Sequence, residues 1–257
     1  MNAMDLPKLE YDQEIIASFF ESIEGELDLP DDSDHTNTYG EVNGDMQEFQ
    51  IRLANTEERR GMASILINKM YSWRGYDNGT SLPDSPNRIT ILAYAGDNIP
   101  IGTMSVGLDS PEGLYADEMY HEELEALRRQ GRKICEFNRL AIDPAVKSKR
   151  IIASLFHICY LYPRALFGHT DGVLEVNPRH VRFYEKMLGF IQIGPERTCP
   201  RVHAPAILMR TDFAYGAEQI MKFGGMMSRA KGERSLYPYF FNAKDEAGII
   251  GRLKAMG

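Results

Sequence analysis

A short helix with both of its ends marked is predicted by the stretch Asn177-Pro-Arg-His-Val-Arg-Phe-Tyr-Glu-Lys-Met-Leu-Gly-Phe190. Asn177 suits the N-cap, the following proline fits the first helical position, and Gly189 stands where a helix usually ends. Val181, Tyr184 and Leu188 lie one turn apart, so they share one face of the helix. Tyr184 is therefore either a core residue or a functional residue presented near the middle of the helix.

Predicted helices and strands alternate through the rest of the chain. Strands are expected over 49–53, 88–95, 101–108, 134–142, 172–176, 190–193 and 206–210, and helices over 11–23, 57–73, 114–129, 149–166 and from 213 onward. The segment Gly96-Asp-Asn98 is typical of a hairpin turn. A meander of antiparallel strands followed by βαβ units predicts an α/β fold with a mixed, mostly antiparallel sheet flanked by helices on both faces.

Composition limits the classes of function. The 257 residues, of which 43% are hydrophobic, suffice for one large domain with appendages. Cys135, Cys159 and Cys199 are widely spaced, which predicts free thiols, and the histidines have no shared ligand spacing, so no metal is expected. The first 14 residues lack the basic region of a signal peptide, and no apolar stretch could span a bilayer. We therefore expect a cytoplasmic protein without an integral membrane segment.

The net charge of −8 is unevenly spread. Residues 1–50 hold 14 acidic residues and one basic residue, whereas the remaining 207 hold 23 acidic and 28 basic residues. An acidic leader thus precedes a mildly basic body, which could attract an acidic partner. Nucleic acid is the least favoured partner, because the chain has neither zinc-finger spacing nor an aromatic-basic RNA motif.

One predicted strand carries polar residues in an apolar setting. Strict alternation would place Glu136, Asn138 and Leu140 on one face of strand 134–142 and Cys135, Phe137, Arg139 and Ala141 on the other. A glutamate inside an apolar strand is costly unless it is paired or functional. Burial would raise the pKa of Glu136 and make it a candidate base near neutral pH. The alternative is a structural ion pair with an arginine.

Two further segments suggest binding. Lys147, Lys149 and Arg150 cluster where the loop after that strand enters a buried helix, and helix-start N–H groups bind phosphate. Three cations oppose the helix dipole there, which argues against a merely solvated helix start. The block 107–129 separates two strands by more than a turn requires, which is typical of a substrate site or a partner surface.

Together these features resemble the long-chain N-acyl amino acid synthases, relatives of the GNAT acetyltransferases and of the acyl-homoserine lactone synthases. The resemblance is strongest at Leu108-Asp-Ser-Pro111, at 136–143 and at 177–190. Ile134-Cys-Glu-Phe-Asn-Arg-Leu140 is similar to the Trp-Glu-x-Ser-Arg-Phe strand of the lactone synthases, with Asn138 in place of serine. The resemblance implies an acetyltransferase-like GNAT domain over 49–215, with an acidic extension over 1–48 and a helical or irregular extension over 216–257.

The resemblance implies transfer of a fatty acyl group from acyl carrier protein to the α-amine of an amino acid. Glu136 would be the base, and Tyr184 would protonate the leaving thiolate. Expected donor contacts are Leu140, Ala141, Ile142, Lys147, Ser148, Lys149, Arg150 and Asn177, and expected acceptor contacts are Arg139, Trp73, Arg74 and Tyr76. No permanently bound cofactor is expected, since acyl-phosphopantetheine or acyl-CoA arrives as a substrate.

The loop after strand 134–142 departs from the family pattern. Acetyl-CoA-dependent relatives carry Gln/Arg-x-x-Gly-x-Gly/Ala there, and this chain lacks the glycines. That difference suits a carrier-protein donor, which offers no nucleotide pyrophosphate. Two alternatives are an acetyl-CoA-dependent N-acetyltransferase of a small amine and a non-catalytic acyl-binding or lipid-binding module.

Overall fold

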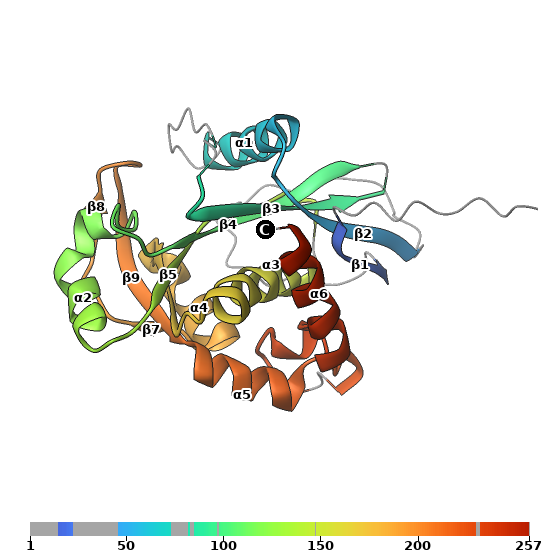
Figure 1. Cartoon of the computed structure of the whole chain (residues 1–257). Coiled ribbons are helices and arrows are strands. Elements are labelled where there is room, and N and C mark those ends of the chain that lie inside the picture. The colour runs from blue at the N-terminus through green and yellow to red at the C-terminus, as the bar shows by residue number, and fades with distance from the viewer. Residues whose placement is uncertain are drawn as a thin grey trace, which may run out of the picture.

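Strands from both halves of the chain build one sheet, and helices cover both of its faces (Figure 1). The computed structural model describes residues 15–22, 46–72, 82, 85–96, 98–146, 148–229 and 232–256. Its strands are β1 (Ile15–Ser22), β2 (Met46–Leu53), β3 (Arg88–Ala95), β4 (Ile99–Leu108), β5 (Ile134–Ile142), β6 (Asp171–Val176), β7 (Ile191–Gln192), β8 (Arg197–Cys199) and β9 (Ala204–Asp212). Its α-helices are α1 (Glu57–Ser72), α2 (Asp117–Arg129), α3 (Lys149–Leu161), α4 (Val181–Leu188), α5 (Phe213–Phe223) and α6 (Ala243–Met256).

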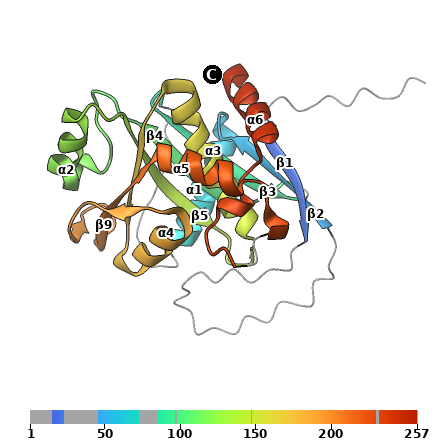
Figure 2. The same ribbon diagram turned by 90° about the horizontal axis from the view of Figure 1, so that it is seen from below.

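The sheet order is β1-β2-β3-β4-β5-β6-β9-β7, with β8 paired to β9 beside this path. Neighbouring strands run antiparallel except β5 and β6, which are parallel and connected by α3. Seen from below, α6 lies alongside β1, so the two ends of the described chain meet at one end of the sheet (Figure 2). This is the mixed, mostly antiparallel α/β sheet with helices on both faces that the sequence predicts, and the prediction is confirmed.

Three hydrophobic clusters hold the layers together. The largest fills the space between the sheet and helices α3, α5 and α6, and α3 is buried from Ile151 to Leu161. Two smaller clusters lie on the opposite face: one joins α1 to β3 and β5, and one joins α2 to β5, β6 and β9. The stretch of sheet between these two small clusters is where the polar residues of β5 lie.

Helix ends form as their sequences predict. Thr56 accepts a hydrogen bond of 3.3 Å from the Arg59 N–H at the start of α1. The Asn177 side chain accepts one from the Arg179 N–H, a short 3₁₀ turn follows, and α4 ends at Gly189 in the left-handed conformation with φ of 70°. The predicted boundaries of β3 and β5 agree with the structure residue for residue.

The helix expected over residues 11–23 is wrong, because the described part of that range is strand β1. Ile16 and Phe19 are buried against the main cluster, and the strand pairs antiparallel with β2. A short apolar run fits either structure, and here pairing with β2 decides.

Within the described residues, each helix is too short or too polar to cross a bilayer.

Candidate active site

A bulge in β5 changes which residues share a face. Opposite β4, Thr103 pairs with Ala141 and Ser105 pairs with Asn138, so β5 carries one extra residue in between. Arg139 takes up the extra residue in the left-handed region, with φ of 55°, which is uncommon outside glycine.

The bulge overturns the alternation expected from sequence. Beyond it, Leu140 and Ile142 pack on the α3 face and Ala141 packs on the α1 face. The Arg139 side chain turns to the Glu136 face instead of the opposite one, and it lines the same pocket as Glu136. The cause is the extra residue, which shifts the two-residue period by one position.

Strands β5 and β6 separate beyond Glu136. Their parallel ladder consists of three pairs, which end at Glu136 and Val173, although β5 continues to Ile142 and β6 to Val176. The helix that connects them starts at the same end of the sheet. Ligands of α/β sheets bind outside the carboxyl ends of strands, so this opening is the expected place for a substrate.

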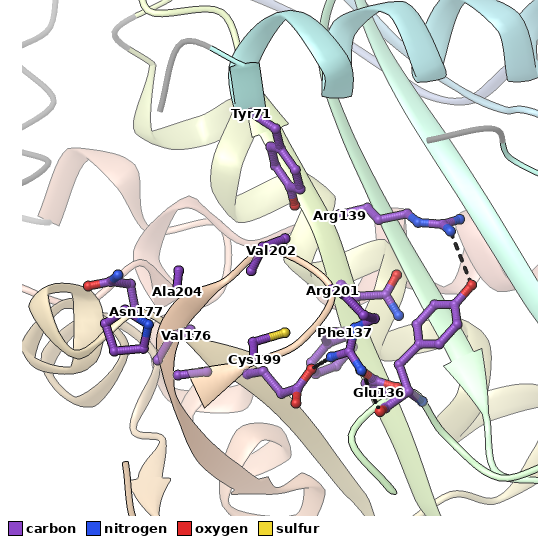
Figure 3. A pocket seen from close by; sticks show the side chains of 15 residues that line it. Tyr71, Glu136, Phe137, Arg139, Val176, Asn177, Cys199, Arg201, Val202 and Ala204 are labelled. Atoms are coloured by element: carbon purple, nitrogen blue, oxygen red, sulfur yellow. Dashed lines mark hydrogen bonds and ion pairs between the residues drawn. The ribbon is translucent and has the colours of Figure 1, made fainter. Parts of the chain in front are cut away.

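A pocket of about 350 Å³ lies at this opening (Figure 3). Its walls are Tyr71, Tyr115, Glu136, Phe137, Asn138, Arg139, Glu175, Val176, Asn177, Cys199, Arg201, Val202, Ala204, Pro205 and Ala206. Glu136, Arg139 and Arg201 lie toward one side of the view, and Val176, Asn177 and Ala204 lie toward the other. The pocket thus combines charged and apolar walls, as small-molecule sites do.

Glu136 is 1% exposed, in the middle of β5. Its Oε2 accepts a hydrogen bond of 2.7 Å from the backbone N–H of Tyr115, in the block before α2. Burial, with a smaller contribution from the negative charge of Glu175, raises the pKa of Glu136 to about 7. A carboxyl group with that pKa can accept and return a proton near neutral pH.

Two arginines contact Tyr115 beside the pocket. Its hydroxyl accepts hydrogen bonds from Arg88 at 2.5 Å and from Arg139 at 3.1 Å. The guanidinium carbon of Arg88 lies 4.0 Å from the centre of the Tyr115 ring. Nε of Arg88 and Nη1 of Arg139 are buried without a hydrogen-bond partner among the described residues. Of the two arginines, Arg139 lines the pocket, and its unsatisfied cationic donor suits an anionic group such as a carboxylate.

A second carboxylate faces the pocket from β6. Glu175 is bonded through Oε2 to Arg201, which also donates to the Tyr115 carbonyl at 3.0 Å and to Glu118. Burial raises the pKa of Glu175. Asn138, next to the bulge, has both polar atoms of its side chain buried without a partner among the described residues.

The candidate donor contacts lie in different places. Asn177 lines the pocket, and Ala141 lies on the same face as Glu136, whereas Leu140 and Ile142 pack toward α3. Tyr184 does not line this pocket. Its ring packs against Phe156, Phe183 and Phe190 with centroid distances of 6.1, 5.3 and 5.8 Å.

The start of α3 is covered by β1. Ser148 is the N-cap, since its Oγ accepts from the Ile151 N–H at 3.2 Å, and the same hydroxyl is hydrogen-bonded to the Glu21 carboxylate. Arg150 donates to the Phe20 carbonyl at 3.1 Å. A carboxylate of the chain itself therefore stands at the helix start where the basic loop predicts phosphate. Lys149 begins α3, and Lys147 lies outside the described residues.

The acceptor contacts are only partly described. Trp73, Arg74 and Tyr76 lie outside the described residues, and Tyr71 of α1, two residues before Trp73, lines the pocket. Sequence reasoning missed Tyr71, Tyr115, Glu175 and Arg201. Of these, Glu175 carried a usable signal, because it is a glutamate within the apolar run Val173-Leu-Glu-Val176. In the part of the chain that the structure describes, no His, Cys, Asp and Glu side chains gather as a metal site.

Comparisons with known proteins point to one family. The sequence profile of the family described as N-acyl amino acid synthase FeeM matches residues 62–212. The solved structure of FeeM, an N-acyl amino acid synthase from uncultured soil microbes, is 29% identical, covers 66% of this chain and 93% of its own, and superposes with a TM-score of 0.60. No protein of curated function matches.

Two more distant solved structures also align. An acyl-CoA N-acyltransferase from Pseudomonas aeruginosa is 14% identical, with a TM-score of 0.44, covering 63% of this chain and 97% of its own. The acyl-homoserine lactone synthase LasI is 13% identical, with a TM-score of 0.46, covering 65% and 89%. The family profile spans more than half of the 257 residues, including β5, β6 and the whole segment between them. The chain belongs to the FeeM family of N-acyl amino acid synthases.

Proposed function

We propose that this protein transfers a fatty acyl group from the phosphopantetheine thioester of an acyl carrier protein to the α-amine of an amino acid. The observation that carries the proposal is Glu136, a buried carboxyl with a pKa of about 7 beside the opening between β5 and β6. An ammonium group must lose a proton before its nitrogen can attack a thioester, and Glu136 would take that proton.

The reaction removes two protons from the acceptor nitrogen and adds one to the leaving sulfur. The acceptor ammonium gives one proton to the Glu136 carboxylate, and the resulting amine attacks the thioester carbonyl carbon. The C–N bond forms, the C–S bond breaks, and the thiolate takes up a proton from Tyr184, which is restored from solvent. The second nitrogen proton and the proton on Glu136 return to solvent. Backbone N–H groups at the free edge of β5, from Leu140 to Ile142, would hold the carbonyl oxygen.

The acceptor end is supported by Arg88 and Arg139. Each has a buried guanidinium nitrogen without a partner among the described residues, and both donate to Tyr115. Of the two, Arg139 lines the pocket, and a carboxylate bound there would satisfy its unpaired donor. An amino acid carries that carboxylate two bonds from the amine nitrogen, which suits a pocket with a carboxyl base and arginines close together.

The carrier-protein donor is supported by the start of α3. The loop lacks the glycines of the acetyl-CoA-dependent pattern, and the Glu21 carboxylate is bonded to Ser148 there. A nucleotide pyrophosphate would meet this carboxylate with like charge. Phosphopantetheine on a carrier protein carries one phosphate and no pyrophosphate.

One assay tests the function. The protein is incubated with a set of acyl-carrier thioesters of different chain lengths and the twenty amino acids, and the products are identified by mass spectrometry. We expect N-acyl amino acids, formed faster from acyl-carrier donors than from the same acyl groups on CoA. Products from acyl-CoA alone would replace the carrier-protein donor with CoA, and the absence of any amide product would contradict acyl transfer to amino acids.

A further inference from the structure

Glu175 is a second carboxylate that lines the pocket, and it has no role in the reaction proposed above. In the parallel ladder, Glu136 pairs with Val173, so Glu175 lies two residues further along the neighbouring strand. Residues two apart on a strand share a face, which places Glu175 on the face of Glu136. Both side chains line the same pocket, at the point where the strands separate.

The two oxygens of Glu175 differ in their surroundings. Oε2 is bonded to Arg201, while Oε1 is buried without a hydrogen-bond partner among the described residues. A buried carboxylate oxygen without a donor is costly, so a donor supplied by a ligand would stabilise it.

The charge around Glu175 is only partly balanced within the chain. Arg201 is shared, since one nitrogen binds Glu175 and the other binds Glu118 and the Tyr115 carbonyl. With Glu136 ionised, this end of the pocket holds two carboxylates and a share of one arginine. The other side of Tyr115 holds Arg88 and Arg139. A zwitterion, with its ammonium at the two glutamates and its carboxylate at Arg139, matches the charges that line the pocket.

We propose that Glu175 binds the ammonium group of the acceptor through its unpaired Oε1, while Glu136 takes the proton. This inference rests on the proposed function and assigns Glu175 a binding role within it. Glu175 exchanges no proton. One ammonium N–H points to Glu175 and another to Glu136. Loss of the second leaves a lone pair on the nitrogen, which stays hydrogen-bonded to Glu175 while it attacks the thioester.

The test compares Glu175→Gln with Glu118→Gln. Both substitutions remove one carboxylate from Arg201, but Glu118 is half-exposed and does not line the pocket. The acceptor probe is an equimolar mixture of the twenty amino acids at varied total concentration, and the donor is octanoyl-pantetheine. We expect Glu175→Gln to raise the apparent KM for amino acids roughly tenfold or more, since a charge-assisted bond is lost. The KM for the donor should not change, and Glu118→Gln should behave as the wild type.

The pH profile separates this role from a structural one. The negative charge of Glu175 raises the pKa of Glu136, so Glu175→Gln should move the acid limb of kcat/KM to lower pH. Arg201→Gln should move it to higher pH, because the positive charge of Arg201 lowers that pKa. If Glu175 served only to hold Arg201 in place, Glu175→Gln and Arg201→Gln would shift the acid limb of kcat/KM in the same direction.

The outcomes are separable. No N-acyl product from the wild type contradicts the proposed function itself. A productive wild type, together with a Glu175→Gln variant that has unchanged acceptor KM and an unmoved acid limb, overturns the role of Glu175 alone. If Glu175→Gln does not fold, Glu175→Asp provides the same comparison, because it keeps the charge but withdraws it by one methylene group. A wild-type acceptor KM in that folded variant also overturns the inference.

Discussion

The backbone N–H of Tyr115 donates a 2.7 Å hydrogen bond to the Glu136 carboxylate. The block between β4 and α2 is thereby tied to the centre of the sheet and closes one side of the pocket. The sequence predicts a substrate site or a partner surface for this block, and Tyr115 supplies a pocket wall. Replacing Tyr115 would disturb a backbone position, two arginines and the carboxylate at once, so single side chains give clearer tests.

Glu136→Gln should lower kcat by about 10²–10⁴-fold, the usual cost of losing a general base. The amide is nearly isosteric and can still accept from the Tyr115 N–H, so folding and KM should change little. Steady-state kinetics with an acyl-carrier donor measure the effect, and thermal unfolding is the control. A kcat near the wild-type value would remove Glu136 from the mechanism.

The activity of the wild type should depend on pH through the same group. Glu136 acts as a base only when ionised, and its pKa is raised to about 7 by burial and by Glu175. Therefore kcat/KM should fall as the pH drops below about 7, with a limb that reports one proton. The residual activity of Glu136→Gln should lack this limb. An acid limb near 4.5 in the wild type would mean that Glu136 is not buried as described.

Tyr184→Phe should fold normally and release the thiol more slowly. The ring packs against Phe156, Phe183 and Phe190, and the substitution keeps that ring while removing the hydroxyl. The slowing should be large with an alkyl thioester and small with an aryl thioester, whose thiolate needs less help to leave. Equal slowing with both donors would assign Tyr184 to packing instead of proton transfer.

Among the basic residues Lys147, Lys149 and Arg150, we expect Arg150 to act through packing and the two lysines to act through charge. Arg150 is held by β1 through the Phe20 carbonyl and the Phe19 ring, so Arg150→Ala should lower the free energy of unfolding by roughly 1–3 kcal/mol. Lys147→Ala with Lys149→Ala should instead raise the KM for an acyl-carrier donor and flatten its salt dependence. Acyl carrier proteins are acidic, and complementary charge acts mainly on the rate of encounter.

Two measurements check this division. Thermal unfolding should show a loss of stability for Arg150→Ala and no such loss for the double lysine variant. Kinetics with a free pantetheine thioester should leave the lysine pair close to the wild type, because that donor has no acidic surface. Equal losses on both donors would mean that the lysines shape the active site.

His157 should make the fold sensitive to acid. It is fully buried, its Nδ1 accepts from the Phe241 N–H at 3.0 Å, and burial lowers its pKa below 6.5. The unfolded chain therefore binds the proton more readily than the folded chain. The contribution of neutral His157 to the free energy of unfolding is fully present above pH 6.5 and is lost as the pH falls through the lowered pKa. Urea unfolding at several pH values measures this loss. His157→Phe should flatten the dependence in that window, and an unchanged slope would assign the effect elsewhere.

Local patterns predicted much of this molecule. Asn177 caps the 3₁₀ turn that leads into α4 and Gly189 ends α4, and the apolar run around Glu136 identified both β5 and its unusual carboxylate. These signals lie within one element, where periodicity and end residues act directly.

What could not be predicted depends on contacts between elements. Arg139 adopts a left-handed conformation that nothing in its neighbours requires, so the bulge and its change of face were hidden. Strand β1 has the composition of either a helix or a strand, and β2 decides between them. The pocket brings together Tyr115, Glu175 and Arg201 from three separate segments, and the spacing of residues in the sequence does not predict such contacts.

Strand β1 has a protective consequence for the molecule. Arg252 of α6 donates to the Ile16 carbonyl at 2.6 Å and Arg150 of α3 donates to the Phe20 carbonyl, so this strand is clamped from two helices while it covers β2. Removal of residues 1–45 would leave the N–H and C=O groups of β2 as a bare sheet edge, open to pairing with another copy. In this way β1 would keep β2 from pairing with the sheet of another molecule.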